Sequence, residues 1–329
     1  MKDYSKNKVL ALYRYLTENT DENHQVSMKD IIEYMQSQGY PYSRDTAMRN
    51  LNQLKNELGV DIISSRGKYA RYYIGARLLE KEELKLIIDS INSSNFIEKE
   101  IAKKMLGKLK SIVSTHDAEE LDRNVLGVNI AKTENKKILY NVNKLQEALN
   151  KGVQIRFRNK NWNVNKELVE TKDYWNKINP WTLIWANDRY YLYGYDVNAK
   201  LSERHYRVDK MDNIEILDTP RKGEREFRGF DATTYVSRRI GMFSGNETYI
   251  TVKVGIKLVG AFIDQFGKEI TIKECVGEEK AKISFNAVPS KNLLGWLIGL
   301  GDVEIISPKF LREDIINLID KNKNYYSKG

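Results

Sequence analysis

Residues 180–196 read PWTLIWANDRYYLYGYD, and residues 205–211 read HYRVDKM. The first stretch places two apolar and aromatic runs around a central Asn-Asp pair, which favours a tight turn, so it predicts an antiparallel β-hairpin. The second stretch predicts a following strand that carries Arg207 and Lys210. An aromatic hairpin beside two cations is the feature from which the fold can be assigned.

These two stretches resemble the core motif of the WYL domain, a ligand-sensing module of bacterial transcription regulators. In that family the pattern runs roughly Pro-x-x-Leu, then Trp-Tyr-Leu after a turn, then Phe-Arg-Leu-Asp-Arg-Ile. The matching parts here are Pro180 with Leu183, residues 190–192 and residues 206–211, with Tyr in place of Trp and Lys210 in place of the final Arg. The resemblance implies a sensor rather than an enzyme, with an output domain elsewhere in the chain.

The composition indicates a protein of several domains with an anionic partner. A chain of 329 residues exceeds the usual size of one hydrophobic core. Its 54 Lys and Arg against 45 Asp and Glu give a net charge of +9, which fits nucleic acid but is weak support alone. No apolar run approaches the roughly 18 residues that span a bilayer, and no secretory signal is visible. We expect a cytoplasmic protein without a membrane partner.

Metal, disulfide and cofactor sites are not expected. The single cysteine, Cys275, has no partner in the chain for a disulfide, and the three histidines are scattered along the sequence. No glycine-rich phosphate loop and no Gly-x-Ser-x-Gly motif occurs. His205 is the histidine beside the motif, and a lone histidine is more often structural than catalytic. We therefore expect no enzyme activity.

The pattern divides the chain into four parts and predicts an α+β multidomain protein. These are a winged helix-turn-helix domain (1–78), a helical linker or dimerisation region (79–150), a small SH3- or Sm-like β-barrel that corresponds to the WYL domain (151–222), and a C-terminal extension (223–329). The extension has the order strand-helix-strand-strand-helix-strand, which suggests a ferredoxin-like sandwich. The sequence of the extension is similar to the one that often accompanies WYL domains.

The first part predicts three helices, at 6–17, 28–38 and 43–58, followed by two strands around a glycine within 61–74. The third helix buries Ala47, Leu51, Leu54 and Leu58 on one stripe. The opposite face carries Asp45, Arg49, Asn52, Gln53 and Asn56.

Such donors suit base edges in a major groove, so the outer face predicts a recognition helix. A solvated helix face is the alternative, although that would ordinarily hold more Glu and Lys. The strands after the helix contain basic residues and predict a wing that contacts phosphates or the minor groove. The candidate DNA-binding residues are Ser43, Arg44, Thr46, Arg49, Asn52, Gln53, Arg66, Lys68 and Arg71.

The predicted barrel has about five short antiparallel strands and offers tyrosine rings with cations, a combination that suits phosphates and unstacked bases. The candidate ligand is an anionic effector, a nucleotide or a single-stranded nucleic acid. The candidate ligand-binding residues are Tyr191, Arg204, Arg207, Lys210 and Arg189. Alternatively the tyrosines fill the barrel and the charges line its rim; we favour this for most of the tyrosines, whereas the resemblance implies a binding role for Tyr191 and Arg207.

Two functions remain open. In the first, a homodimeric regulator, with repression the favoured direction, binds a double-stranded DNA operator under the control of its effector. In the second, an accessory factor of a defence or DNA-repair system binds single strands without sequence specificity. Equal affinity for all duplexes would count against the regulator. Lys210 keeps the charge of the family's Arg but lacks its planar fork, so bidentate phosphate binding is not expected there.

Overall fold

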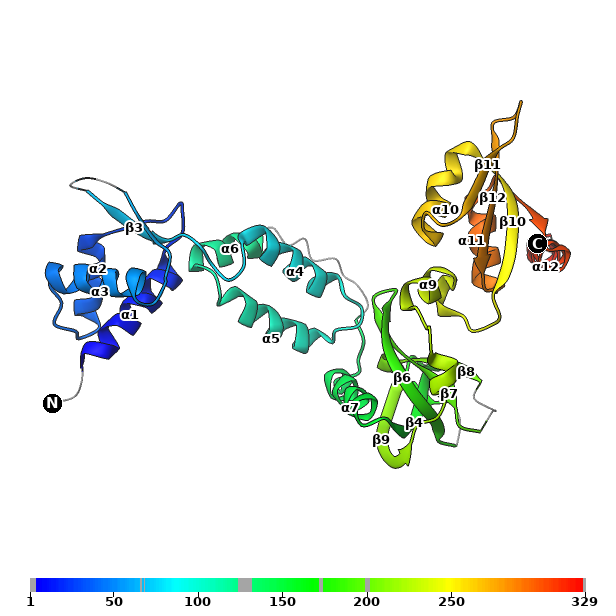
Figure 1. Cartoon of the computed structure of the whole chain (residues 1–329), viewed down its shortest axis with the longest axis horizontal. Coiled ribbons are helices and arrows are strands. Elements are labelled where there is room, and N and C mark those ends of the chain that lie inside the picture. Colours follow the sequence, from blue (N-terminus) through cyan, green and yellow to red (C-terminus); the bar gives the residue numbers. More distant parts are fainter. Residues whose placement is uncertain are drawn as a thin grey trace. The chain divides into compact units, whose positions relative to one another are not determined.

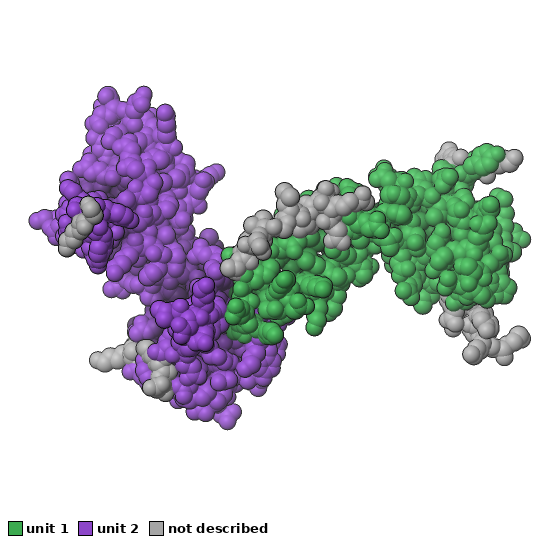
Figure 2. Space-filling view, turned by 180° about the vertical axis from the view of Figure 1, so that it is seen from behind, with its two compact units in different colours: residues 1–136 green, residues 137–329 purple. Residues whose placement is uncertain are grey.

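The computed structural model describes residues 4–65, 67, 69–123, 132–171, 174–198 and 202–327. The chain forms two compact units, Met1–Lys136 and Lys137–Gly329, shown in different colours in Figure 2. The boundary between the units falls inside the predicted linker. In the described part of the chain, no helix combines the length and the apolar character that crossing a bilayer requires.

The first unit holds three N-terminal helices, a small sheet and three further helices (Figure 1). Its elements are α1 (Tyr4–Asn19), β1 (Val26–Ser27), α2 (Met28–Ser37), α3 (Arg44–Asn56), β2 (Ile62–Ser64), β3 (Arg71–Ile74), α4 (Lys81–Ser93), α5 (Lys99–Lys110) and α6 (Thr115–Arg123). The sheet order is β1-β3-β2, and both pairs are antiparallel. The three predicted N-terminal helices and the following hairpin are therefore present, together with the short strand β1, which was not predicted.

Serine caps fix where two of these helices begin. The Ser27 side chain accepts from the Asp30 amide while the Asp30 carboxylate accepts from the Ser27 amide, which forms a capping box before α2. The Ser43 hydroxyl accepts from the Thr46 amide at 3.3 Å before α3. Both caps confirm the predicted helix starts.

Most of the predicted apolar stripe of α3 is buried. Ala47, Leu51 and Leu54 lie in the core together with Leu12, Leu16, Ile31 and Met35 from α1 and α2. The prediction for Leu58 was wrong, because its side chain is 62% exposed. The helix ends at Asn56, so Leu58 no longer follows the helical period that would turn it inward.

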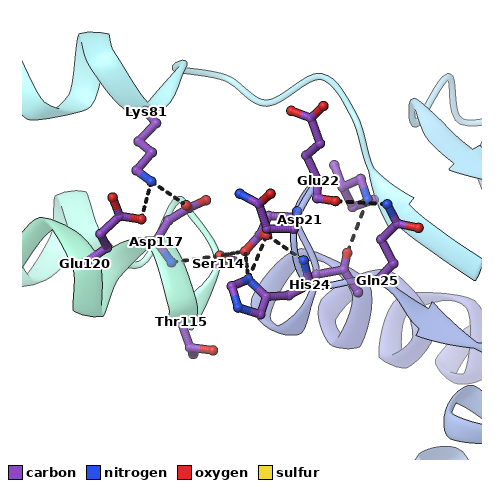
Figure 3. Close-up of polar contacts among 12 residues, drawn as sticks. Asp21, Glu22, His24, Gln25, Lys81, Ser114, Thr115, Asp117 and Glu120 are labelled. Carbon is purple, nitrogen blue, oxygen red and sulfur yellow. Dashed lines mark hydrogen bonds and ion pairs between the residues drawn. The ribbon is translucent and has the colours of Figure 1, made fainter.

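A polar junction joins the loop after α1 to the start of α6 within the first unit (Figure 3). The buried Asp21 carboxylate accepts from the Ser114 hydroxyl at 2.6 Å and lies 2.9 Å from Nδ1 of His24. The His24 ring stacks on the His116 ring, with ring centroids 3.8 Å apart. The Thr115 hydroxyl donates to the Glu18 carbonyl at 3.1 Å. These contacts attach the end of α1 and the loop after it to the start of α6.

The α6 helix was not among the predicted elements, because the linker was predicted only as helical over residues 79–150. The α5 helix ends at Lys110, and the Ser114 hydroxyl accepts from the Asp117 amide at 3.0 Å, so it caps the next helix. Lys81 of α4 then reaches the carboxylates of Asp117 and Glu120 on α6. Ser114 therefore marks the start of α6 and not the end of α5.

The second unit begins with α7 (Ile138–Lys151), which lies against a curled antiparallel sheet. The strands are β4 (Val153–Trp162), β5 (Leu168–Glu170), β6 (Asn176–Ala186), β7 (Arg189–Asp196), β8 (Glu203–Arg207) and β9 (Met211–Pro220), with a 3-10 turn η1 (Val208–Lys210) between the last two. The order is β5-β4-β6-β7-β8, and β9 pairs with β4. The long strand β4 thus pairs with β5, β6 and β9, and the sheet curls around it.

One hydrogen bond and one close approach of two strands fix the shape of this sheet. The buried Asn141 amide of α7 donates to the Met211 carbonyl at 2.8 Å, which fixes the helix against the start of β9. A Cβ at Gly194 would lie 2.2 Å from the Asn179 carbonyl oxygen. Glycine is therefore required where β6 and β7 come together beside the register shift near Pro180.

The rest of the unit is a short helical segment followed by a four-stranded sheet with its own core. Its elements are α8 (Glu224–Phe227), α9 (Ala232–Ser237), η2 (Ile240–Met242), β10 (Thr248–Gly255), η3 (Ile256–Leu258), α10 (Val259–Phe266), β11 (Thr271–Glu274), β12 (Lys280–Ala287), α11 (Lys291–Leu300), β13 (Val303–Ser307) and α12 (Lys309–Tyr326). The sheet order is β11-β12-β10-β13. The inward side chains of β10, such as Ile250 and Val252, pack with Phe262 of α10 and Leu297 of α11.

We predict that the junction makes the stability of the first unit sensitive to acid. Burial acts to raise the pKa of Asp21, but hydrogen bonds from Ser114 and His24 outweigh it and hold the pKa below its ordinary value. A carboxylate with a lowered pKa stabilises the fold above the pKa of the unfolded state, and that contribution is lost as the pH falls through the folded-state pKa. The unfolding free energy of the wild type should therefore fall more steeply than that of Asp21→Asn between neutral pH and about pH 3.

Urea unfolding over a pH series measures this difference, with the exposed Asp45→Asn as the matched control. Parallel pH profiles for the wild type and Asp21→Asn would show that the junction carboxylate contributes no linkage.

Candidate functional site

The helix α3 is held in place by a buried polar contact. The Asn50 side chain, 5% exposed, donates to the Tyr42 hydroxyl at 2.9 Å, which ties the middle of α3 to the turn before it. Tyr42 is itself buried, and the Lys8 ammonium donates to the neighbouring Pro41 carbonyl at 3.0 Å. The turn and the helix therefore move together, and the orientation of the outer face is fixed by the core.

The outer face of α3 is exposed as predicted for Arg44, Arg49 and Asn52, whereas Thr46 and Gln53 are half-buried. The hydroxyls of Ser43 and Thr46 lie 3.1 Å apart and serve the helix start. Charge and amide groups thus project from one side of the helix.

On the hairpin after α3, Arg71 is exposed and donates through Nη1 to the Gln25 carbonyl at 3.0 Å. This bond attaches β3 to the loop before β1. The other two predicted hairpin residues, Arg66 and Lys68, lie outside the described residues.

A second group of candidate residues lies where β7 and β8 pair. The register places Tyr191 opposite Arg207, Tyr193 opposite His205, and Tyr195 opposite Glu203. Because side chains alternate along a strand, these three pairs share one face. We call the Tyr191–Arg207 pair the near rung, the Tyr193–His205 pair the middle rung and the Tyr195–Glu203 pair the far rung.

The middle and far rungs are covered by the segment that follows the sheet. Nδ1 of His205 lies 3.0 Å from the Tyr235 hydroxyl of α9, and Nε2 contacts the Met242 carbonyl. The Tyr235 hydroxyl donates to Glu203 at 2.8 Å. Burial lowers the pKa of His205 below its ordinary value.

The same segment supplies a buried cation. The Arg239 guanidinium is paired with Glu203 at 3.3 Å and with Glu247 at 2.9 Å, and it lies 3.7 Å from the centroid of the Tyr235 ring. Its charge is thus compensated inside the unit, where the residue is only 5% exposed. His205 and Arg239 therefore belong to a structural network.

The interpretation of these tyrosines as barrel filler is corrected by their packing. Tyr191, Tyr193 and Tyr195 cluster with Tyr235 and Met242 of the following segment. The interior of the curled sheet is filled from the opposite side of the strands, where Leu192 pairs with Tyr206, whose ring meets Phe157 edge-on at 4.9 Å. The period of a strand shows which residues share a face, but it does not show which face is covered by a later segment.

At the near rung the Arg207 guanidinium is oriented by a buried carboxylate. Its Nε and Nη2 donate to the two oxygens of Asp209 at 3.0 and 2.6 Å, a bidentate pair in which Asp209 is 6% exposed. Burial acts against the charge, but these hydrogen bonds outweigh it and keep the pKa of Arg207 above its ordinary value. The Arg207 guanidinium therefore stays charged, and its orientation is set by Asp209.

Lys210 brings a second positive charge to the same place. Its ammonium lies 4.7 Å from the centroid of the Trp162 ring, and the residue is 9% exposed. Burial first, and then the neighbouring cation Arg207, lower the pKa of Lys210; Asp209 acts to raise it, and Arg189 acts to lower it. Two cationic side chains close together in a partly buried environment favour the binding of an anion that neutralises them.

The predicted ligand residues are therefore brought together with one exception. Arg189 and Arg207 both act electrostatically on the Tyr191 hydroxyl, whose pKa burial raises, and Arg189 also acts on Lys210. Arg204 lies opposite Gly194 and alternates away from the face that carries Arg207. Its guanidinium is 3.8 Å from the Asp196 carboxylate.

Three residues of this place were not predicted. Asp209 stands in the quoted motif and orients Arg207, and Asn187 of the hairpin turn forms a side-chain hydrogen bond with Tyr191. Trp162 comes from β4, far from the motif in sequence. An acidic residue two positions after an arginine was a signal for the first, whereas no sequence pattern could have placed Trp162.

Residues 140–216 match the WYL domain family. The chain contains a WYL domain. It runs from α7 through most of β9, so the near rung, Asp209 and Lys210 all lie within the WYL domain. A comparison with curated proteins finds no matching sequence.

Two solved structures are similar to the chain as a whole only in outline. One is proteasome accessory factor B/C (PafBC) of Arthrobacter aurescens, with 14% identity and a TM-score of 0.30 over 96% of this chain and 48% of that one. The other is a CRISPR Cas-related protein, with 11% identity and a TM-score of 0.37 over 95% of this chain and 98% of that one. The chain thus spans about half the length of the PafBC structure. At these scores neither likeness carries an argument, and the WYL domain rests on the family match alone.

We predict that Tyr42→Phe destabilises the first unit by about 1–3 kcal/mol, because it leaves the buried Asn50 amide without its acceptor. Urea unfolding of the full chain, followed by a signal of the first unit, measures this loss. Tyr13→Phe on α1, whose side chain is 40% exposed, is the matched control and should change the unfolding free energy little. An equal effect of the two variants would show that the Asn50 contact does not hold α3.

Proposed function

We propose that this WYL-domain protein is a transcription regulator that binds operator DNA as a homodimer and responds to an anionic nucleotide or single-stranded nucleic acid. Repression is the favoured direction. The observation that carries the proposal is the convergence of Arg189, Arg207 and Lys210 within the WYL domain.

The first unit supports the DNA-binding half of the proposal. Its helices α1 to α3 and the sheet β1-β3-β2 have the element order of a winged helix-turn-helix, with α3 as the recognition helix. The exposed side chains of Arg49 and Asn52 can bond guanine and adenine edges respectively. The hairpin with Arg71 would then lie along the phosphate backbone as the wing.

The second unit supports the sensing half. The strand order β11-β12-β10-β13, with α10 and α11 in the core, supports a ferredoxin-like extension after the WYL domain. This extension is joined to the WYL domain by the segment that covers the middle and far rungs. An effector at the near rung therefore binds beside the contact between sensor and extension.

A single-strand-binding accessory factor is the remaining alternative. The same cations would serve it, so the second unit does not separate the two functions. Sequencing of the DNA fragments that the protein selects from its own genome does separate them. Palindromic sites upstream of particular genes are expected for a homodimeric regulator, whereas fragments without a common sequence would contradict it.

We predict that Arg49→Ala weakens operator binding by about 1–3 kcal/mol, because a lost base contact costs that much. Fluorescence anisotropy with the selected operator and with a scrambled duplex measures the affinity and the specificity. Lys29→Ala on α2, exposed at the surface, is the control. A loss that is equal on both duplexes would show that Arg49 contacts phosphate rather than a base.

We predict that Arg207→Ala leaves operator affinity without effector unchanged and abolishes the response to effector. A mixed pool of short single strands and mononucleotides serves as the effector probe in the same anisotropy assay. Arg204→Ala, on the other face of β8, is the matched control and should respond like the wild type. A normal response of Arg207→Ala would remove this residue from the effector site.

A further inference from the structure

A cavity of about 520 Å³ lies next to the near rung, within the second unit. It is bounded by the end of β6 and the following turn, by α9 and η2, and by the last turns of α10. The volume is in the range of small-molecule sites, which are commonly formed between domains. Its walls come from the WYL domain on one side and from the C-terminal extension on the other.

The cavity and the near rung share a wall. Asn187 lines the cavity, and its side chain hydrogen-bonds Tyr191. Ile184, which also lines the cavity, is the cross-strand neighbour of Tyr191, and Tyr191 in turn is paired with Arg207. Ile184, Tyr191 and Arg207 therefore lie on one face of the sheet, and the cavity is beside them on that face.

The charge of the cavity differs from that of the near rung. The one cation among its lining residues is Arg239, which is already paired with Glu203 and Glu247, and this leaves the cavity without an uncompensated positive charge. The Asp264 side chain of α10 is exposed at the lining, and it is a pure hydrogen-bond acceptor when ionised. The cavity is therefore suited to an uncharged group with N–H donors rather than to a second phosphate.

The other lining residues favour a flat ring. Ile184, Val236 and Ile240 give apolar surface. Gln265 donates through Nε2 to the Ser237 carbonyl at 3.4 Å, which leaves its amide oxygen as a further acceptor beside Asp264. An apolar wall with carboxylate and amide acceptors at one edge is the environment in which proteins bind an unstacked base by its hydrogen-bonding edge.

We propose that this cavity binds a cytosine base, belonging to the nucleotide whose phosphate contacts Arg207 and Lys210. The inference rests on the effector site under Proposed function and adds base selectivity to it. Asp264 accepts from the amino group, as acidic side chains do with N4 of cytosine. Uracil presents a carbonyl oxygen at that position, which the carboxylate repels. A bound nucleotide would also touch the WYL domain and the extension at once.

Cytidine and uridine nucleotides test the proposal, because the amino group at C4 of cytosine is a carbonyl oxygen in uracil, where N3 also carries a hydrogen. Isothermal titration of the full-length protein with CMP and with UMP, and with short all-C and all-U single strands, gives the affinities. The wild type should bind the cytosine ligands roughly tenfold or more tightly than the uracil ligands. Asp264→Ala should remove this preference, whereas Asp320→Ala on the exposed surface of α12 should keep it.

The outcomes separate this inference from the proposed effector site. Equal affinities for cytosine and uracil ligands that both depend on Arg207 would overturn the base pocket and leave the effector site intact. A preference that survives in Asp264→Ala would also overturn it. Absence of binding by any of these ligands would overturn the base pocket, and the mixed pool with Arg207→Ala in the anisotropy assay then decides the effector site separately.

Discussion

The pairing register of β7 with β8 is the constraint on which the second unit depends. It places Tyr191, Tyr193 and Tyr195 on the same face as Arg207, His205 and Glu203. A shift by one residue would turn this whole set to the other side of the sheet. Gly194 is part of the constraint, because any side chain there would meet the Asn179 carbonyl. The register thus decides at once where the cations gather and where the extension attaches.

Two different uses of charge lie on this one face. At the far rung, Glu203 is neutralised by Arg239 inside the protein, and Tyr235 completes its hydrogen bonds. At the near rung, Arg207 has Asp209 on one edge while Lys210 adds charge that no described carboxylate binds. Buried polar groups cost free energy unless they are satisfied. The far rung is therefore paired within the protein, whereas at the near rung Arg207 and Lys210 are both beside one carboxylate, that of Asp209.

Local patterns in the sequence predicted much of this, and contacts distant in sequence limited the rest. The caps at Ser27 and Ser43, the α3 stripe through Ala47 and Leu54, and the hairpin around residues 187–188 follow from short-range rules. Those rules also revealed the WYL domain.

They missed α6, because Ser114 fits a helix end as well as a helix start until its Asp21 contact is known. They missed Trp162 because its contact with Lys210 depends on the tertiary fold, which brings β4 to η1, and not on any spacing in the sequence. The covering of the tyrosine face by α9 was hidden for the same reason: neighbours across a sheet can be derived from strand alternation, but the segment that packs on the sheet cannot.

The hydrogen bond from Asn141 to the Met211 carbonyl has a consequence for signalling. Met211 follows Lys210 directly, and Asn141 lies one turn after Lys137, where the second unit begins. Lys137 also contacts Asp212 at 3.2 Å. The residue that would sense an anion and the root of the chain leading to the first unit are thus fastened to the same short piece of backbone. A change at Lys210 would therefore act directly on the backbone that holds the first turns of α7.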